Sequence, residues 1–313
     1  MTYAFVVGCP RSGTTWLQML LAQHPKIATT QETHLFNSYI APLQDAWKAH
    51  ASAPRGIGLR AALTPEEFDG LCFDFARHAL SRIAEHGNGS SVVLEKTPTH
   101  VRHAALIIKL FPEARFIHLI RDPRAVVASL CAAGGSWGHT WASADPVVNA
   151  RRWVFDVSAG RDIASLTDYY YVLKYEDLLD GEGWRVLQDL LEWLGLEAND
   201  GFCRQTLLDC AIDRLRNNGT SVKSGAIISD DPAGFYRQGK ADSWSSELSR
   251  RALQNIEYIA GALMQDYGYV GVTKFAGGAR KPFRLKLRDA LDGIEWRSNR
   301  GLTRSFARAR RVI

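Results

Sequence analysis

The sequence predicts an α/β fold of three layers, in which a parallel sheet is flanked by helices on both faces. Short apolar segments rich in β-branched and aromatic residues have the length of buried strands, and helical patterns separate them. Strands that alternate with helices are typical of a parallel sheet. A chain of 313 residues, 46% of them hydrophobic, can bury the core of one such domain. The expected strands lie at 3–7, 27–30, 91–95, 116–120 and within 168–178.

The first strand leads into a glycine-bounded loop, residues 8–13, that has the pattern of a phosphate-binding loop. An apolar helix follows over 16–22, so loop amides and a helix N-terminus face the same point. The glycine spacing matches a P-loop, but Thr14 stands where a nucleotide triphosphatase has lysine. Arg11 carries the positive charge instead. We therefore expect a phosphate ligand other than a magnesium-bound γ-phosphate.

Residues 10–16, Pro-Arg-Ser-Gly-Thr-Thr-Trp, resemble the 5′-phosphosulfate-binding loop of sulfotransferases that use 3′-phosphoadenosine 5′-phosphosulfate (PAPS). The resemblance implies a bacterial-type, P-loop-like sulfotransferase fold, with PAPS as cofactor and adenosine 3′,5′-bisphosphate (PAP) as product. It implies that Arg11 binds the cofactor and stabilises charge on the bridging oxygen. A glycine turn without a ligand is the alternative. The remaining loop residues that the resemblance assigns to the cofactor are Ser12, Gly13, Thr14, Thr15 and Trp16.

The second expected strand delivers two candidate bases to the same edge of the sheet. Ligands collect at the carboxyl ends of parallel strands, and Glu32 and His34 follow the strand at 27–30. Glu32 resembles in position the glutamate base of glycan and tyrosylprotein sulfotransferases. His34 is the other candidate, and a polar loop that caps the next helix is the non-functional alternative.

Residues 37–90 carry few motifs. We interpret 37–62 as a candidate acceptor-side lid, and Thr64 with Glu67 predicts the start of a helix. Four aromatic residues either line a substrate pocket or, as is commoner, pack in the core: Phe36, Tyr39, Trp47 and Phe68.

The third expected strand ends in Glu-Lys-Thr-Pro at 95–98, which resembles the Lys-Thr-Pro element of bacterial and glycan-directed sulfotransferases. That resemblance places Lys96 beside the sulfuryl group. Cytosolic animal members have a histidine base where this chain has Pro98, so that base is missing here. We interpret His100 as a helix-start residue.

The fourth strand is followed by Arg121 and, eight residues later, Ser129, the spacing of the family's 3′-phosphate site. Arginine offers a planar fork for phosphate oxygens, and serine adds a neutral donor. A local ion pair between Arg121 and Asp122 is the alternative.

Two further segments resemble cofactor contacts. The Tyr-Glu-Asp element places Tyr175 beside the adenine, with an ordinary edge-strand tyrosine as the alternative. Residues 235–244 resemble, with Gln238 and Ala241 as departures, the loop that closes over the 3′-phosphate. In that loop Arg237, Gly239 and Lys240 would supply charge and amides. In a different loop, Trp137, His139 and Trp141 are expected to border the acceptor.

These resemblances imply in-line transfer of a sulfuryl group from PAPS to the hydroxyl of an acceptor, which is a glycan, a small alcohol or phenol, a lipid-linked alcohol or a peptide tyrosine. No metal is implied, because Lys and Arg can neutralise the developing charge. The rival interpretations are a P-loop kinase and a non-catalytic nucleotide-binding or membrane-docking protein.

Composition separates two regions, a sulfotransferase domain at 1–273 and a basic amphipathic segment at 274–313. The segment holds twelve Lys and Arg against three Asp and Glu. Within this segment, residues 282–313 are either a membrane-surface or docking arm or a helix packed on its own domain. Five cysteines without metal-site spacing indicate reduced thiols, and a strand at the N-terminus argues against a signal peptide. We therefore expect a cytoplasmic protein, in the membrane-arm case peripheral at the inner membrane surface, with no nucleic-acid partner.

Overall fold

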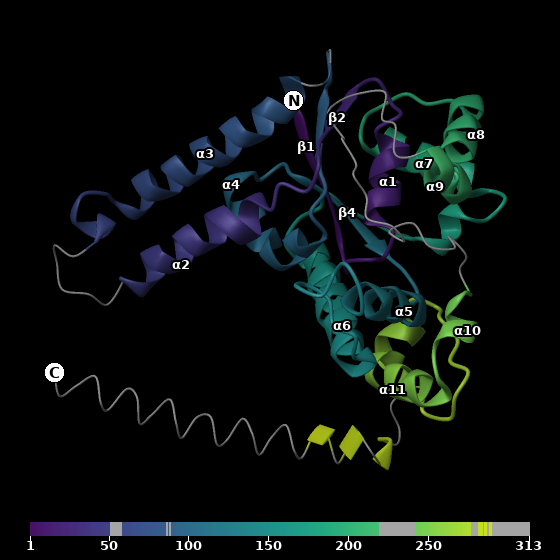
Figure 1. Cartoon of the computed structure of the whole chain (residues 1–313). Coiled ribbons are helices and arrows are strands. Elements are labelled where there is room, and N and C mark those ends of the chain that lie inside the picture. Colours follow the sequence, from purple (N-terminus) through teal and green to yellow (C-terminus); the bar gives the residue numbers. More distant parts are fainter. Residues whose placement is uncertain are drawn as a thin grey trace, which may run out of the picture.

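The computed structural model describes residues 1–50, 58–85, 87, 89–218, 242–276, 281–283, 285–286 and 288–289. Its centre is a five-stranded sheet in the order β2-β3-β1-β4-β5, and every neighbouring pair is parallel (Figure 1). The predicted α/β fold is confirmed. The strands are β1 Thr2–Gly8, β2 Ile27–Thr29, β3 Val92–Glu95, β4 Arg115–Ile120 and β5 Tyr170–Lys174.

β1 lies in the middle of the sheet, between β3 and β4. Phe5 is in register with Glu95 on one side and Phe116 on the other. Because the strands are parallel, the segments after β1, β3, β4 and β5 all leave the sheet at the same edge. The phosphate loop, Lys96, Arg121 and Tyr175 are therefore neighbours by topology.

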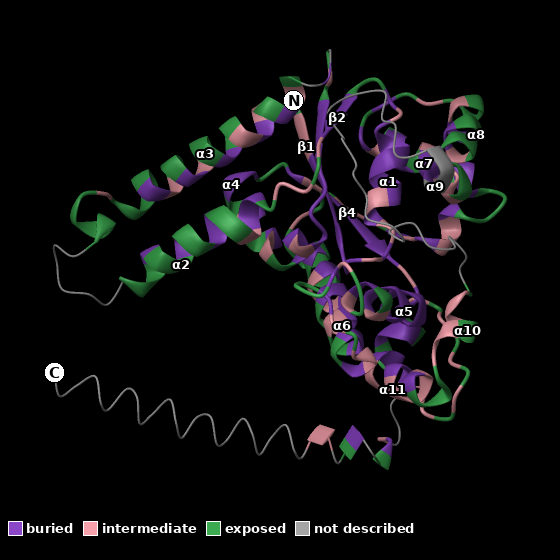
Figure 2. Cartoon of the chain, viewed as in Figure 1, coloured by how far each residue is buried: buried purple, intermediate pink, exposed green. Residues whose placement is uncertain are grey.

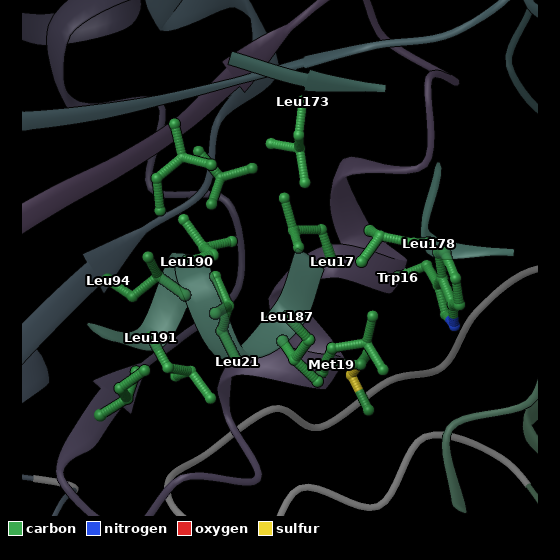
Figure 3. Packing of buried hydrophobic residues seen from close by; sticks show 14 of the residues in the cluster. Trp16, Leu17, Met19, Leu21, Leu94, Leu173, Leu178, Leu187, Leu190 and Leu191 are labelled. Atoms are coloured by element: carbon green, nitrogen blue, oxygen red, sulfur yellow. The ribbon is translucent and has the colours of Figure 1, made fainter. Parts of the chain in front are cut away.

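Alternation along β1 divides the core into two layers. Ala4 and Val6 face one hydrophobic cluster, and Phe5 and Val7 face the other. The first cluster lies under α1 (Thr14–Leu21) and α7 (Gly183–Trp193), where leucines of both helices meet leucines of the strands (Figure 3). These include Leu17, Leu21, Leu94, Leu173, Leu187, Leu190 and Leu191.

The opposite face is covered by α3 (Pro65–Glu85) and α4 (Ala104–Leu110). α3 buries residues at helical spacing and leaves its other side exposed (Figure 2). The predicted start of α3 is confirmed, because Thr64 and Glu67 bond reciprocally as a capping box. Three of the four aromatics discussed above are core residues (Phe36, Trp47 and Phe68), whereas Tyr39 is exposed.

A third group of helices lies below the sheet, beyond the carboxyl ends of the strands (Figure 1). It comprises α5 (Pro123–Gly134), α6 (Pro146–Asp162) and α11 (Arg250–Asp266), which bury a common apolar cluster. Asp122 and Asp145 cap α5 and α6, each followed by proline at the first helical position. The remaining elements are α2 (Ala41–Ala49), α8 (Asp200–Asp209), α9 (Ile212–Asn218), α10 (Trp244–Glu247), the π-helical turn η1 (Leu35–Ile40), and the 3₁₀ turns η2 (Leu59–Ala61), η3 (Pro98–His103), η4 (Ile163–Ser165) and η5 (Glu176–Leu178).

The start of the basic segment packs on the domain where it is described. Leu285 is buried, Arg288 Nη1 lies 2.5 Å from Asp145 Oδ2, and Asp289 pairs with Arg151 of α6. Residues 290–313 lie outside the described part. All five cysteines are free thiols. Among the described residues, helices of the length and apolarity needed to cross a bilayer are absent.

Candidate active site

The phosphate loop has a backbone that only glycine allows at two positions. Gly8 has φ 149°, and a Cβ there would lie 2.5 Å from the carbonyl oxygen of Leu119. Gly13 has φ 99°, and a Cβ there would lie 2.5 Å from the ring of Tyr175. The loop is thus packed against β4 and against the residue that follows β5.

A cavity of about 530 Å³ opens at this loop and joins most of the predicted site residues. It is lined by Arg11, Gly13, Thr14, Thr15, Trp16, Glu32, His34, Arg121, Ser129 and Tyr175. Lys96 contacts two of the lining residues, Thr15 and Glu32, and Ser12 is a fully buried residue of the loop. The predicted residues Arg237, Gly239 and Lys240 lie outside the described part of the chain.

Lys96 and Glu32 form the central ion pair of the site. Lys96 Nζ lies 2.6 Å from Glu32 Oε1 and donates to Thr15 Oγ1 at 3.2 Å. The Lys96 side chain is 3% exposed and that of Glu32 is 34% exposed. His34 Nε2 lies 3.5 Å from the other Glu32 oxygen. Both candidate bases therefore face the cavity, and the carboxylate lies between two nitrogen-bearing side chains.

The predicted 3′-phosphate residues are also brought to the loop. Arg11 Nε donates to Ser129 Oγ at 3.0 Å, so the loop cation touches α5 directly. The Arg121 guanidinium lies 4.1 Å from the centre of the Tyr175 ring, a cation–π geometry. The neighbouring Asp122 carboxylate is bound by Arg124, at 2.6 Å from Nη2 and 3.0 Å from Nε.

Tyr175 is a wall of the cavity and part of the core at once. Its side chain is 1% exposed, and its ring packs edge-to-face on Trp16 at 5.1 Å. Burial raises the pKa of Tyr175 above its ordinary value, and the nearby Arg121 opposes the rise. The phenol is therefore neutral. Its ring supplies a flat apolar surface next to the Arg121 guanidinium and the phosphate loop.

The residues around the phosphate loop fit a group with several negative charges. Ser12 Oγ is fully buried and has no hydrogen-bond partner among the described residues, so a donor or acceptor is available at the bottom of the loop. Arg11, Arg121 and Arg152 line the cavity, whereas Glu32 is its one carboxylate in the described part of the chain.

The cavity is also lined by residues outside the phosphate-binding motifs. Trp137 and Trp141 line it as expected, but His139 is not among the lining residues. Arg152 of α6 lines it too, held by the carbonyl oxygen of Trp141 at 2.7 Å. Nothing in the sequence marked Arg152, because it stands in mid-helix without a motif. Asn37, Pro98 and Thr99 line the cavity as well.

Comparison with known proteins agrees with this geometry. A family model described as "Sulfotransferase family" matches residues 4–200. A protein-tyrosine sulfotransferase of Drosophila melanogaster is 33% identical over 131 residues, which are 42% of this chain and 25% of the relative. Protein-tyrosine sulfotransferase 1 of Homo sapiens is also 33% identical over 131 residues, 42% of this chain and 34% of the relative. The matched region thus spans a quarter to about a third of these relatives' length.

Solved structures share the fold. The sulfotransferase domain from the curacin biosynthetic pathway has a TM-score of 0.52 and 18% identity, covering 84% of this chain and 97% of that one. Mouse sulfotransferase SULT7A1 complexed with PAP has a TM-score of 0.51 and 13% identity, covering 85% of each chain.

Proposed function

Because the chain belongs to the sulfotransferase family, we propose that it transfers the sulfuryl group of PAPS to the hydroxyl of an acceptor. The observation that carries the proposal is the Lys96–Glu32 pair, which lies beside Thr15 of the phosphate loop and opens on the same cavity. A base and a cation are thus held together where a phosphate-binding loop ends. A P-loop kinase is not favoured, since the family model matches a sulfotransferase and Thr14 replaces the kinase lysine.

PAPS, when bound, supplies an activated sulfuryl group and leaves as PAP. The chain's own residues would do the rest. Ser12, Thr14 and Thr15, with the loop amides, would hold the 5′-phosphate, and Arg121 with Ser129 the 3′-phosphate. A mouse relative with this fold is described as complexed with PAP, which supports that choice of ligand.

Glu32 would accept the proton of the acceptor hydroxyl. Its Oε2 faces His34 and its Oε1 faces Lys96, so the carboxylate is oriented before an acceptor arrives. Lys96, released from Glu32 as the carboxylate becomes protonated, would donate to the oxygen on which charge develops. Arg11 would stabilise the same charge from the phosphate loop. This chemistry uses no metal ion.

The aromatic lining of the cavity favours a flat hydroxyl-bearing ring. Trp137 and Trp141 pack against each other with ring centres 5.5 Å apart, and both line the cavity together with Arg152, which adds a cation. A phenol or tyrosine side chain fits such walls, and the relatives named above are protein-tyrosine sulfotransferases. We propose phenolic hydroxyls as the first acceptors to test.

Two measurements test the proposal. PAP without magnesium should stabilise the folded protein by about 2.7 kcal/mol at a hundredfold excess over Kd, and the melting temperature should rise accordingly. ATP with magnesium should change the melting temperature little. Labelled sulfate should then pass from PAPS to a phenol or tyrosyl peptide, or to a component of a fractionated cell extract. Equal stabilisation by ATP with magnesium would favour the kinase instead.

For the basic segment we propose a docking role confined to residues 290–313, because Asp289 already pairs with Arg151 of α6 and Arg288 with Asp145, the N-cap of α6. Deleting 290–313 should leave PAP affinity unchanged and weaken binding to anionic vesicles. Unchanged vesicle binding would contradict the docking role.

A further inference from the structure

A second carboxylate, that of Glu95, lies next to the Lys96–Glu32 ion pair in the chain. Glu95 is the last residue of β3 and precedes Lys96, so strand alternation turns the two side chains to opposite sides. Glu95 is 1% exposed. Its carboxylate accepts from Thr33 N at 3.3 Å and Oγ1 at 2.8 Å, and from Thr97 N at 3.0 Å and Oγ1 at 2.6 Å. His100 Nδ1 lies 2.8 Å away.

The hydroxyls of this cluster link Glu95 to backbone amides of the Glu32 segment. Thr97 Oγ1 also accepts the amide of His34 at 3.2 Å, and Thr33 Oγ1 accepts the amide of Leu35 at 3.1 Å. Each of the two hydroxyls donates its one proton to Glu95. His100 Nε2 accepts the amide of Phe36 at 3.2 Å, which leaves the ring proton on Nδ1, facing Glu95.

Glu95 therefore accepts four hydrogen bonds, with the His100 ring nitrogen 2.8 Å away, and is a carboxylate. Burial by itself raises the pKa of Glu95, but its contacts with His100, Thr97 and Thr33 outweigh burial and lower the pKa to about 2. A protonated or amide side chain at this position would place a donor against donors. The negative charge is thus required for the cluster to be satisfied.

What the cluster holds is the segment that carries Glu32. β2 ends at Thr29, so residues 30–36 have no sheet ladder to hold them. The four consecutive amides of residues 33–36 instead bond to Glu95, Thr97, Thr33 and His100. The same segment includes His34 at φ 51°, a left-handed conformation that costs free energy for a non-glycine residue.

We propose that Glu95 is a positioning residue, which fixes the Glu32 segment so that the Glu32 carboxylate meets Lys96 and the acceptor hydroxyl. The proposal rests on the proposed function, because Glu32 is the base of that reaction. Glu95 itself does not touch the cavity. A displacement of about 1 Å at the reacting groups can cost on the order of a hundredfold in rate, so loosening this segment should lower turnover while sparing the phosphate loop.

The test uses Thr33→Val and Thr33→Ser in the full-length protein with PAP bound. Valine keeps the shape of Thr33 but removes the hydroxyl that links Glu95 to the Leu35 amide, whereas serine keeps it. Thr33 is half-buried, so both variants should fold. We expect amide hydrogen exchange of residues 33–36 to rise at least about tenfold in Thr33→Val and to stay near wild type in Thr33→Ser.

Turnover per PAP-binding site should follow the same order, with kcat reduced about tenfold or more in Thr33→Val, PAP affinity unchanged and serine restoring the rate. Glu95→Gln should lose more exchange protection at residues 33–36, and more kcat, than Thr33→Val does. The matched control is Glu257→Gln. Glu257 is a buried carboxylate that also accepts two backbone amides, those of Val272 and Thr273, but contacts nothing in the Glu32 segment.

Glu257→Gln should leave exchange at 33–36 unchanged. If Glu95→Gln and Thr33→Val also leave that exchange unchanged, Glu95 does not hold the segment and the proposal is wrong. If exchange rises but kcat per PAP site does not fall, the cluster is structural only. The exchange measurement needs no acceptor, so a failure of sulfuryl transfer in the wild-type protein would refute the proposed function separately.

Discussion

Replacing Lys96 with methionine should separate folding from catalysis. Lys96 is 3% exposed, so its removal relieves the cost of burying an ammonium group. The partner left behind, Glu32, is 34% exposed and can be solvated. We therefore expect the free energy of unfolding to change by no more than about 1 kcal/mol, the scale of an exposed ion pair. That corresponds to a shift in Tm of roughly 2–4 °C.

Turnover should fall much further. Lys96 is the buried cation nearest the proposed base, and removing one preorganised donor from a developing negative charge costs about 10²–10³ in kcat. Thermal unfolding, PAP titration and transfer of labelled sulfate measure the three quantities on one preparation. Lys109→Met is the control, because Lys109 of α4 pairs with Asp69 of α3, outside the cavity. A Lys96→Met enzyme that keeps kcat within about threefold of wild type would refute the assigned role.

Three further outcomes are expected. Glu32→Gln should lower turnover by at least about a hundredfold with PAP affinity intact, and His34→Asn by about tenfold or less; the reverse order in the transfer assay would make His34 the base. Gly13→Ala should weaken PAP binding in calorimetry by about tenfold or more, since φ 99° and the Tyr175 ring both oppose a Cβ; unchanged binding would contradict the loop geometry. Glu95 has a pKa lowered from 4.5 to about 2, so its stabilising contribution is present above pH 4.5 and is lost as the pH falls toward 2. Urea unfolding across that range should show a flatter pH dependence in Glu95→Gln; parallel curves would argue against an ionised Glu95.

The structure differs from the sequence-based expectation in the segment that carries Glu32 and His34. Glu32 and His34 follow the strand that the sequence predicts at 27–30, but β2 ends at Thr29 and His34 is left-handed. The two side chains still meet, because Glu95, Thr97 and His100 hold the loop between them. His100 does lie in a helical turn at the start of η3 as expected, yet its ring also serves that cluster.

The sequence by itself determined the sheet, the phosphate loop and most of the residues that line the cavity. These features are local: strands are read from apolar runs, the loop from glycine spacing, and the cavity from the rule that parallel strands end at one edge. Only the tertiary structure decided which side chains touch. The Lys96–Glu32 bond joins residues 64 positions apart, and the Arg11–Ser129 bond joins residues 118 positions apart. Arg152 and the Glu95 cluster were missed for the same reason, since their roles depend on partners from other elements and leave no pattern along the chain.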